Sequence, residues 1–435
     1  MYVLCTFFVF LHQKSDFVSD MKTAFLIAAA SSGSGKTTLT IGLLRALRNK
    51  GYKVQPFKCG PDYIDPLYHR IACGRDSVNL DTWMQSEQDV KQVFLRYSQD
   101  ADISIVEGVM GLYDGADGIR GSSAEVAELL GIPVVLVINA RSMAHSIAPI
   151  LKGYLTYRPA TQIAGVIFNN VGSSRHEQML RRAAEEVGMP VIGAIPRMKE
   201  LYSPCRHLGL DISETERINQ LAEKVAEIIQ NSKFKILNCQ LSTVNCQLST
   251  INSAPAKAGR IYIARDAAFN FLYRQTIDYL RERGEVHFFS PLANETVPQD
   301  ADLVFLPGGY PEFFLPQLSQ SHATMESLRQ TRARVWAECG GMMYLSEGID
   351  DTDMTGLLPF RTTMQGARLH LGYRSIKIGD KELRGHEFHY SSIMGTPPAS
   401  DIQLFDAQGH PVDTGFYIHG NIYAGYTHWL YPLIT

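Results

Sequence analysis

The segment "AFLIAAASSGSGKTTLTIGLLRALRNKG" (residues 24–51) decides the fold, because it joins a strand pattern to a helix pattern through a glycine-rich turn. Its apolar start predicts a buried strand, and the apolar spacing from Lys36 predicts a helix of about four turns that ends at Gly51. This order of elements is the context that a phosphate-binding loop requires. The strict loop pattern has glycine at position 30, where this chain has Ala30. The simpler alternative is a turn that merely caps the helix.

The loop "AASSGSGKTT" (29–38) predicts an ATP site. Its backbone N–H groups, at the positive end of the helix, would bind phosphate oxygens. Lys36 would neutralise the β- and γ-phosphates, and the hydroxyl of Thr37 would bind Mg²⁺. The predicted ATP-binding residues are Gly33, Ser34, Gly35, Lys36, Thr37 and Thr38.

Four carboxylates follow two further strand patterns. "KCGPDYIDPLYH" places Asp62 and Asp65 just after an apolar run. "SIVEGVMGLYDG" places Glu107 at the end of another, with Asp114 seven residues later. Each aspartate alone is typical of a turn. However, parallel sheets bind ligands at the carboxyl ends of their strands, and Mg²⁺ prefers a few hard oxygens. Beside the loop, these four residues therefore predict a nucleotide–metal site.

Strand patterns alternate with helix patterns along most of the chain, which predicts parallel sheets covered by helices on both faces. We therefore predict an α/β protein with two doubly wound, mostly parallel-sheet domains, the second with a more strand-rich tail. Between them, "NCQLSTV" and "NCQLSTI" repeat one another in a polar stretch, which indicates a linker. The predicted divisions are an extension at 1–20 with translation starting at Met21, an ATP-binding domain at 21–230, the linker at 231–258 and a second domain at 259–435.

Composition excludes several classes of protein. The formal net charge of −3 offers no basic surface for a nucleic acid. The apolar run at residues 1–11 is too short to span a bilayer, so no membrane is expected. The seven cysteines are odd in number and include no CxxC pair. This argues against a disulfide framework or structural zinc and favours the cytoplasm. A homodimer is compatible with the sequence, which does not set the oligomeric state.

The segment "RVWAECGGMMYL" (334–345) places Cys339 between a strand pattern and a helix pattern. A sharp turn there would expose the sulfur near a helix N-terminus, and both features would lower the pKa of the thiol. On spacing alone, an inert core thiol is an equal alternative. His428 in "GYTHWL" offers a base. The amides of Gly309, in "FLPGGYPE", and Gly340 could bind an oxyanion.

An ordered set of motifs resembles the family of cobyrinate a,c-diamide synthases. The resemblance runs from about residue 23 to the end, apart from the linker, and implies a P-loop, dethiobiotin-synthetase-like ATP domain followed by a triad-type, class I glutamine amidotransferase domain. The motifs are "SSGSGKTTLT", "FKCGPDYIDPLYH", "NLDTWM", "EGVMGLYDG", "SRHEQML", "RHLGL", "ARDAAFNF", "LPGGYPE", "AECGGMMYL" and "GHEFHYS".

The resemblance implies a mechanism in two halves. Cys339 attacks the amide of L-glutamine, His428 acts as base and then as acid, and amides near Gly309 and Gly340 stabilise the oxyanion. Separately, ATP with Mg²⁺ phosphorylates a carboxylate of cobyrinate or a related tetrapyrrole. Ammonia then attacks the acyl phosphate, first at one and then at the other of the a and c side chains, in cobalamin biosynthesis. The ligands implied for Mg²⁺ or the acyl phosphate are Thr37, Asp62, Asp65, Glu107 and Asp114.

The sequence departs from the usual triad and leaves alternatives open. Many such amidotransferases carry glutamate two residues after the histidine, whereas Trp429 and Leu430 follow His428 here, which indicates a Cys–His dyad. The substrate could instead be nickel sirohydrochlorin or hydrogenobyrinate. A non-catalytic P-loop binding protein with a degenerate second half is the alternative from another class. "GHEFHYS" lacks the spacing of a zinc motif, and as a strand it would turn His386 and His389 to opposite sides.

Overall fold

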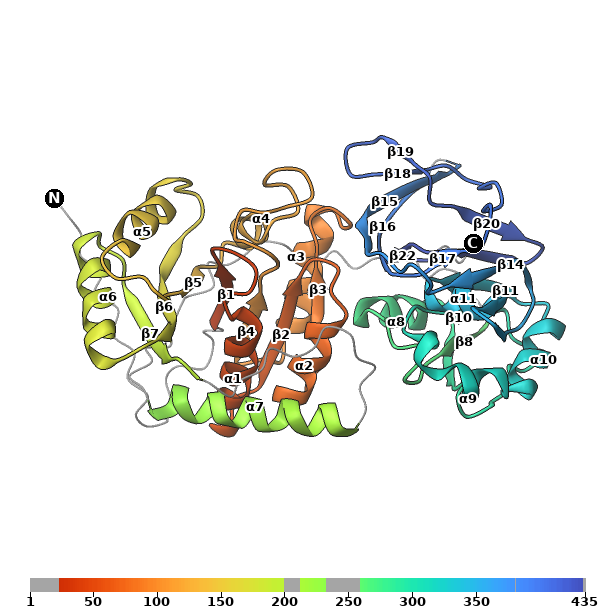
Figure 1. The fold of residues 1–435 in the computed structure, drawn as a ribbon, viewed down its shortest axis with the longest axis horizontal. Coiled ribbons are helices and arrows are strands. Elements are labelled where there is room, and N and C mark those ends of the chain that lie inside the picture. Colours follow the sequence, from red (N-terminus) through yellow and green to blue (C-terminus); the bar gives the residue numbers. More distant parts are fainter. Residues whose placement is uncertain (1–22, 199–211, 232–258, 380, 433–435) are drawn as a thin grey trace. The chain divides into compact units, whose positions relative to one another are not determined.

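The computed structural model describes residues 23–198, 212–231, 259–379 and 381–432. These residues form two compact units, 23–198 with 212–231, and 259–432 (Figure 1). The predicted extension at 1–20, the start at Met21, nearly all of the predicted linker and the "RHLGL" motif lie outside the described residues.

The first unit is built on a seven-stranded sheet with the order β3-β2-β4-β1-β5-β6-β7. Every adjacent pair is parallel, so the predicted parallel sheet is confirmed. Nearly continuous apolar runs form the central strands, because helices cover both of their faces. The strands are β1 (Thr23–Ala29), β2 (Val54–Cys59), β3 (Val78–Leu80), β4 (Ile103–Glu107), β5 (Val134–Asn139), β6 (Ile163–Val171) and β7 (Val191–Pro196).

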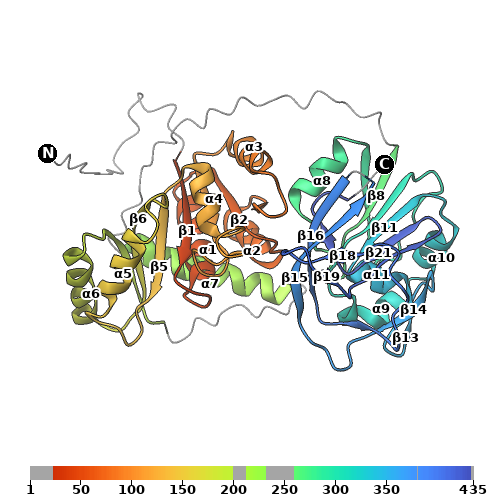
Figure 2. The ribbon, with the colours of Figure 1, turned by 90° about the horizontal axis from the view of Figure 1, so that it is seen from above.

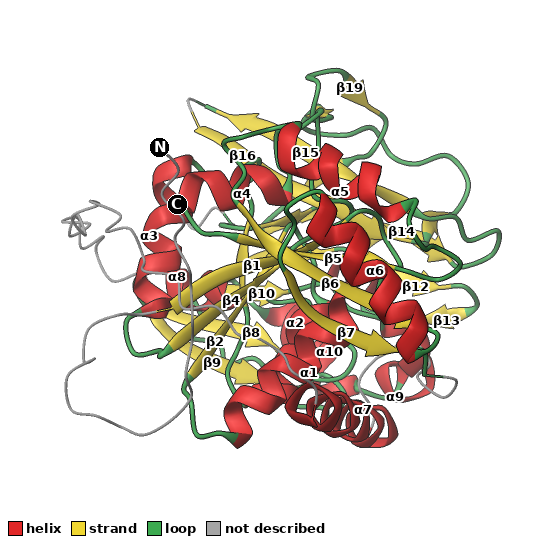
Figure 3. Cartoon of the chain, turned by 90° about the vertical axis from the view of Figure 1, so that its left-hand side faces the viewer, coloured by secondary structure: helices red, strands yellow, loops and turns green. Residues whose placement is uncertain are grey.

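Helices lie on both faces of this sheet, as a doubly wound fold requires. One face carries α1, α2 and α7, and the other carries α3 to α6 (Figures 2 and 3). The helix predicted from Lys36 begins there and ends at Asn49, two residues before Gly51. The helices are α1 (Lys36–Asn49), α2 (Ile64–Cys73), α3 (Glu87–Ser98), α4 (Ser123–Leu130), α5 (Ile147–Thr156), α6 (Ser174–Glu186) and α7 (Ile212–Asn231).

The second unit contains a six-stranded sheet with the order β20-β21-β11-β10-β8-β9, in which β20 alone runs antiparallel to its neighbour. Its strands are β8 (Arg260–Ala264), β9 (Glu285–Phe289), β10 (Leu303–Leu306), β11 (Arg334–Glu338), β20 (Phe416–His419) and β21 (Ile422–Gly425). Its helices are α8 (Arg274–Arg281), the 3₁₀ helix η1 (Pro311–Phe314), α9 (Leu315–Ser319), α10 (His322–Gln330) and α11 (Gly340–Leu345).

Two smaller sheets account for the strand-rich tail that the sequence predicted. One has the order β13-β12-β14-β17 and the other the order β19-β18-β15-β16-β22. Their strands are β12 (Ser346–Ile349), β13 (Thr352–Asp353), β14 (Leu358–Thr363), β15 (His370–Ile378), β16 (Lys381–His389), β17 (Ser392–Ile393), β18 (Leu404–Phe405), β19 (Pro411–Val412) and β22 (His428–Trp429).

Each unit has a hydrophobic core of its own. The first core includes Leu26, Phe57 and Phe168, and the second unit buries Val304 and Trp336. No helix within the described residues is long and apolar enough to cross a membrane.

Candidate active sites

The predicted phosphate loop joins β1 to α1. Gly35 caps α1 at φ 95°, and a Cβ there would lie 2.2 Å from Nδ2 of Asn169, so the position requires glycine. Asn169 donates a hydrogen bond of 3.0 Å to the carbonyl oxygen of Ser34, which ties the loop to β6. Lys36 is buried, and its ammonium donates to the carbonyl oxygen of Met110 at 2.5 Å. The loop is therefore held by contacts from β6 and from the segment after β4.

Three predicted residues meet at the carboxyl edge of the sheet. The hydroxyl of Thr37 donates to Oε1 of Glu107 at 2.7 Å and lies 3.3 Å from Oδ2 of Asp65. These side chains come from α1, the last residue of β4 and the first turn of α2. The structure thus brings together residues that the sequence separates by up to 70 positions.

Lys58, which the sequence analysis missed, lies at the centre of this cluster. Its ammonium is 2.5 Å from Asp65, 3.1 Å from Glu107 and 3.8 Å from Asp62, and its side chain is 3 % exposed. Burial would lower the pKa of Lys58, but the three carboxylates outweigh burial and hold it above its usual value. A lysine within a buried strand pattern was the available signal, because such an ammonium must find carboxylates.

Glu107 is fully buried and contacts Lys58, His69 and Thr37. His69 lies with Nε2 2.8 Å from Oε2 of Glu107 and with Nδ1 3.0 Å from the hydroxyl of Ser77. Burial raises the pKa of Glu107, but Lys58, His69 and Thr37 together hold it below its usual value. Glu107 is therefore an anion in the folded protein. His69 was a second residue that the sequence analysis missed.

The other two predicted carboxylates make different contacts. Asp62 accepts hydrogen bonds from the backbone N–H groups of Ile64 and Asp65, at the start of α2. Asp114 is exposed and accepts from the N–H of Gly111 within its own loop. Thus Asp62 joins the cluster through Lys58, whereas no hydrogen bond or ion pair among the described contacts joins Asp114 to it.

In the second unit, Cys339 lies on the sharp turn from β11 to α11, at φ 45° and ψ −108°. A non-glycine residue holds this conformation at a cost, which is typical of a nucleophile elbow. Two details of the prediction were wrong. The residue is 3 % exposed rather than open to solvent. Burial raises the pKa of the thiol rather than lowering it, Glu312 raises it further, and the N–H of Gly340 opposes them.

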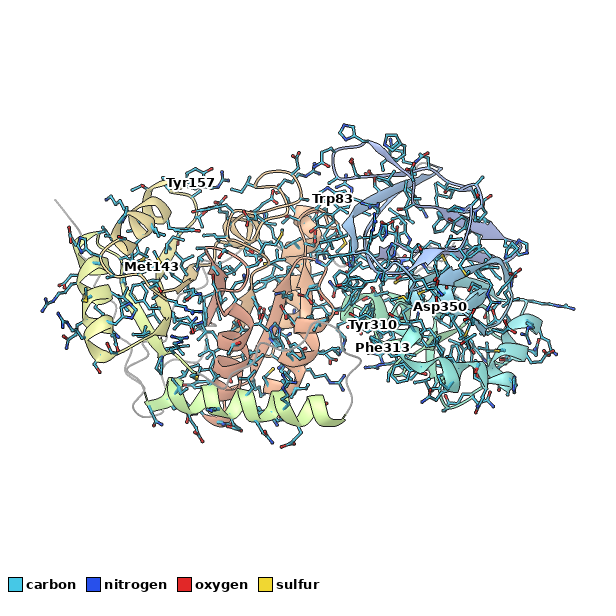
Figure 4. All side chains as sticks on the ribbon, in the orientation of Figure 1. Trp83, Met143, Tyr157, Tyr310, Phe313 and Asp350 are labelled. Carbon is cyan, nitrogen blue, oxygen red and sulfur yellow. The ribbon has the colours of Figure 1, made fainter. Side chains whose placement is uncertain are left out.

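The two predicted oxyanion-binding glycines are neighbours. A Cβ on Gly340 would lie 3.1 Å from the backbone nitrogen of Gly309, so the two loops touch beside Cys339. No side chain fits on Gly309 either, because its Cβ would lie 2.0 Å from the carbonyl oxygen of Ala268. After Gly309 the chain continues through Tyr310 and Phe313, which are labelled in Figure 4. The centroids of their rings lie 5.6 Å apart.

His428 is fully buried on β22. Its ring stacks on His386 at 5.2 Å, and its Cε1 edge packs so closely on Gly308 that a Cβ there would lie 2.1 Å away. Burial, reinforced by His386, holds the pKa of His428 well below its usual value. The imidazole is therefore neutral and able to accept a proton.

A carboxylate also lies near His428, although it does not come from the residues that directly follow the histidine. Oε2 of Glu338 is 3.9 Å from Nδ1 of His428, and both side chains are buried. The predicted Cys–His dyad is thus accompanied by an acid. Glu338 directly precedes the predicted nucleophile, and this position was the available signal in the sequence for the acid.

The "GHEFHYS" motif lies on β16 among buried partners. Nδ1 of His386 is 3.2 Å from the hydroxyl of Tyr273, His389 stacks on Tyr426 at 3.8 Å, and Glu387 pairs with Arg374 at 2.8 Å. The described residues hold no cluster of three or more His, Cys, Asp or Glu side chains suited to a metal ion.

Comparisons with known proteins match one domain family to each unit. Residues 25–210 match the model of the CobQ/CobB/MinD/ParA nucleotide binding domain, and residues 260–432 match that of the CobB/CobQ-like glutamine amidotransferase domain. The chain is 42 % identical to the cobyrinate a,c-diamide synthase of Priestia megaterium, over 93 % of each chain. It is 40 % identical to the hydrogenobyrinate a,c-diamide synthase of Brucella anthropi, over 93 % of this chain and 97 % of that one.

These similarities extend over nearly the whole chain and include both the phosphate loop and the cysteine elbow. The chain therefore belongs to the family of cobyrinate and hydrogenobyrinate a,c-diamide synthases, which are ligases with a glutamine amidotransferase domain.

Proposed function

We propose that this chain uses ATP and L-glutamine to convert the a and c carboxylates of a cobyrinate-type tetrapyrrole to amides, in cobalamin biosynthesis. One observation carries the proposal. A single chain combines the Thr37–Glu107–Lys58 cluster beside a phosphate loop with a strained Cys339. Gly340, directly after this cysteine, touches the glycine turn 308–309, and that turn packs on the buried His428. The tetrapyrrole acceptor is inferred from the names of the chain's relatives.

The glutaminase half proceeds through a thioester. His428 takes the thiol proton as the sulfur of Cys339 bonds to the amide carbon of glutamine. The N–H groups of Gly309 and Gly340 stabilise the oxyanion, since their loops touch beside the sulfur. Protonated His428 then gives its proton to the departing ammonia, and water hydrolyses the thioester. The high pKa of the resting thiol favours proton transfer during attack over a standing thiolate.

The synthetase half uses the P-loop. ATP transfers its γ-phosphoryl group to a ring carboxylate, and ammonia then displaces phosphate to form the amide. Lys36 is buried at the N-terminal end of α1, where phosphate oxygens bind. The ammonium of Lys58, held by Asp65 and Glu107, can stabilise charge on the transferred group.

Residues around Thr37 fit Mg²⁺. The hydroxyl of Thr37 and the carboxylate of Glu107 are hard oxygen ligands 2.7 Å apart. Lys58 contacts three carboxylates, whose oxygens are further hard ligands for a divalent cation. Because the described residues hold no ready metal cluster, phosphate oxygens and water would complete the coordination. When bound, Mg²⁺ would neutralise charge on the β- and γ-phosphates.

Product analysis tests the proposal. Purified protein is incubated with ATP, Mg²⁺ and glutamine, and with cobyrinate or hydrogenobyrinate in parallel. Mass spectrometry should show two successive replacements of hydroxyl by amine on at least one acceptor. Cys339→Ala should abolish amidation from glutamine and retain amidation from ammonia, whereas Lys36→Ala should abolish both. The absence of any amidated product with either acceptor would reject the proposed substrate.

A further inference from the structure

A buried acid beside the catalytic base has no role in the mechanism above. Glu338 is the last residue of β11, directly before Cys339, and is 2 % exposed. A carboxylate buried this deeply must be compensated by hydrogen bonds or charge. What compensates it therefore indicates its function.

The two oxygens of Glu338 have different surroundings. Oε1 accepts hydrogen bonds from Nε1 of Trp336 at 2.9 Å and from the backbone N–H of Trp429 at 3.2 Å. Oε2 faces Nδ1 of His428 at 3.9 Å. The tryptophan contacts fix the carboxylate through one oxygen, and the other is directed at the imidazole.

The backbone holds this arrangement from two sides. Trp336 and Glu338 are two residues apart on β11, so they share one face of the strand. On the other side, β22 pairs antiparallel with β16 and sets His428 opposite His386. Since Nδ1 faces Glu338, Nε2 is the ring nitrogen that the proposed mechanism assigns to Cys339.

We propose that Glu338 is the positioning residue of the glutaminase site, holding His428 in the tautomer that accepts the Cys339 proton at Nε2. This rests on the proposed function. As the sulfur attacks glutamine, the thiol proton moves to Nε2, the proton already on Nδ1 stays there, and the Glu338 carboxylate stabilises the imidazolium. No proton passes to Glu338. Catalytic hydrogen bonds are often long in free enzymes, and this one would shorten as His428 becomes charged.

The groups around His428 include the carboxylate of Glu338, which faces the Nδ1 atom. His386 stacks on the ring and in turn contacts Tyr273, while Glu387 is paired with Arg374. Glu312 acts on the thiol rather than on the ring. Glu338 thus supplies the carboxylate that faces Nδ1 within the described residues.

The test is Glu338→Gln, which keeps an oxygen for both tryptophan contacts and places an N–H group opposite Nδ1. We expect kcat for glutamine hydrolysis to fall by about 10²- to 10⁴-fold with little change in KM, while amidation from ammonia is retained.

Burial raises the pKa of Glu338 to about 8. Because the ionised form is needed, wild-type kcat/KM should rise as pH increases through about 8, and Glu338→Gln should lack this rise.

Two further variants separate positioning from folding. Glu338→Asp keeps the charge and should retain the pH-dependent rise at a reduced kcat. Trp336→Phe removes a donor to Oε1 and should lower the melting temperature much more than kcat. Glutaminase activity of Glu338→Gln within about twofold of wild type, with Cys339→Ala inactive, would overturn the positioning role and leave the proposed function standing. Full glutaminase activity in Cys339→Ala would overturn both.

Discussion

At the scale of single residues, Lys58 supplies the positive charge among the carboxylates beside the phosphate loop. Its ammonium contacts Asp62, Asp65 and Glu107 and has almost no access to water. Without it, the negative charges would face one another at the phosphate loop. The residue therefore has two roles, since it stabilises the fold there and can also meet the transferred phosphoryl group.

We predict that Lys58→Met abolishes amidation with either nitrogen donor and retains glutamine hydrolysis. It should also destabilise the first unit by about 3 kcal/mol, because breaking a buried ion pair leaves uncompensated charge. Urea unfolding and the two activity assays measure these effects. Adding Asp65→Asn should restore part of the stability but none of the amidation. Wild-type amidation from ammonia in Lys58→Met would contradict the prediction.

At the scale of elements, α7 is anchored against α1 and α2. Arg45 on α1 donates to the carbonyl oxygens of Ile71 and Ala72 and to side chains of Asn219 and Glu223 on α7. One turn earlier, Gly42 lets α7 approach closely, because a Cβ there would lie 2.1 Å from Cγ1 of Val225.

We predict that Gly42→Ala destabilises the first unit by about 1–3 kcal/mol, even though alanine favours helix. The added methyl group would overlap Val225 and push α7 away from α1. Val225→Ala should recover most of this loss in the double variant, as a coupling of about 0.5–3 kcal/mol in a double-mutant cycle of urea unfolding. Additive effects of the two changes would show that the helices do not meet at this point.

Strand β16 buries two histidines whose pKa values change on folding. Burial lowers the pKa of His386 and of His389 to about 3, whereas an unfolded histidine titrates near about 6.5. Between these values the unfolded chain binds more protons than the folded one. Each of these histidines should therefore lower the free energy of unfolding as pH falls below about 6.5, by about 1.4 kcal/mol per pH unit. Glu338 and Glu312, whose pKa values burial raises to about 8 and about 7, contribute in the opposite direction over the same range.

Urea unfolding at pH 7.5 and 5.5 measures this contribution. The transition is followed by a probe in the second unit, such as the fluorescence of Trp336 and Trp429. His389→Phe keeps a ring against Tyr426 and should remove one histidine's share of the pH dependence. A pH dependence that is the same in His389→Phe as in the wild-type protein would contradict neutral burial of His389.

At the scale of the whole molecule, the chain has two units with separate hydrophobic cores and separate chemistry. We predict two thermal transitions in calorimetry. A non-hydrolysable ATP analogue with Mg²⁺ should stabilise one of them, by about 2.7 kcal/mol at 100 times its Kd. A reactive glutamine analogue that alkylates Cys339 should raise the other. Equal shifts of both transitions by either ligand would show instead that the units unfold together.

Much of this architecture could be predicted because it depends on local patterns. The apolar run before Lys36 and the glycines around it predicted β1, the loop and α1, and the structure has all three within two residues of the expected ends. The turn at Cys339 was predicted in the same way, from a strand pattern followed by two glycines. Lys58, His69 and Glu338 could not be assigned in this manner, because the titratable groups that they face lie on other elements.

By itself, the sequence determined the succession of strands and helices, the phosphate loop and the cysteine elbow, since hydrophobic period and turn chemistry act over a few residues. The tertiary structure alone decided how the charged groups pair. It placed Lys58 among three carboxylates and Glu338 behind His428, and it buried Cys339 so that the pKa of its thiol is raised. Burial and electrostatic energy sum over every neighbour in space, and those neighbours come from distant parts of the chain.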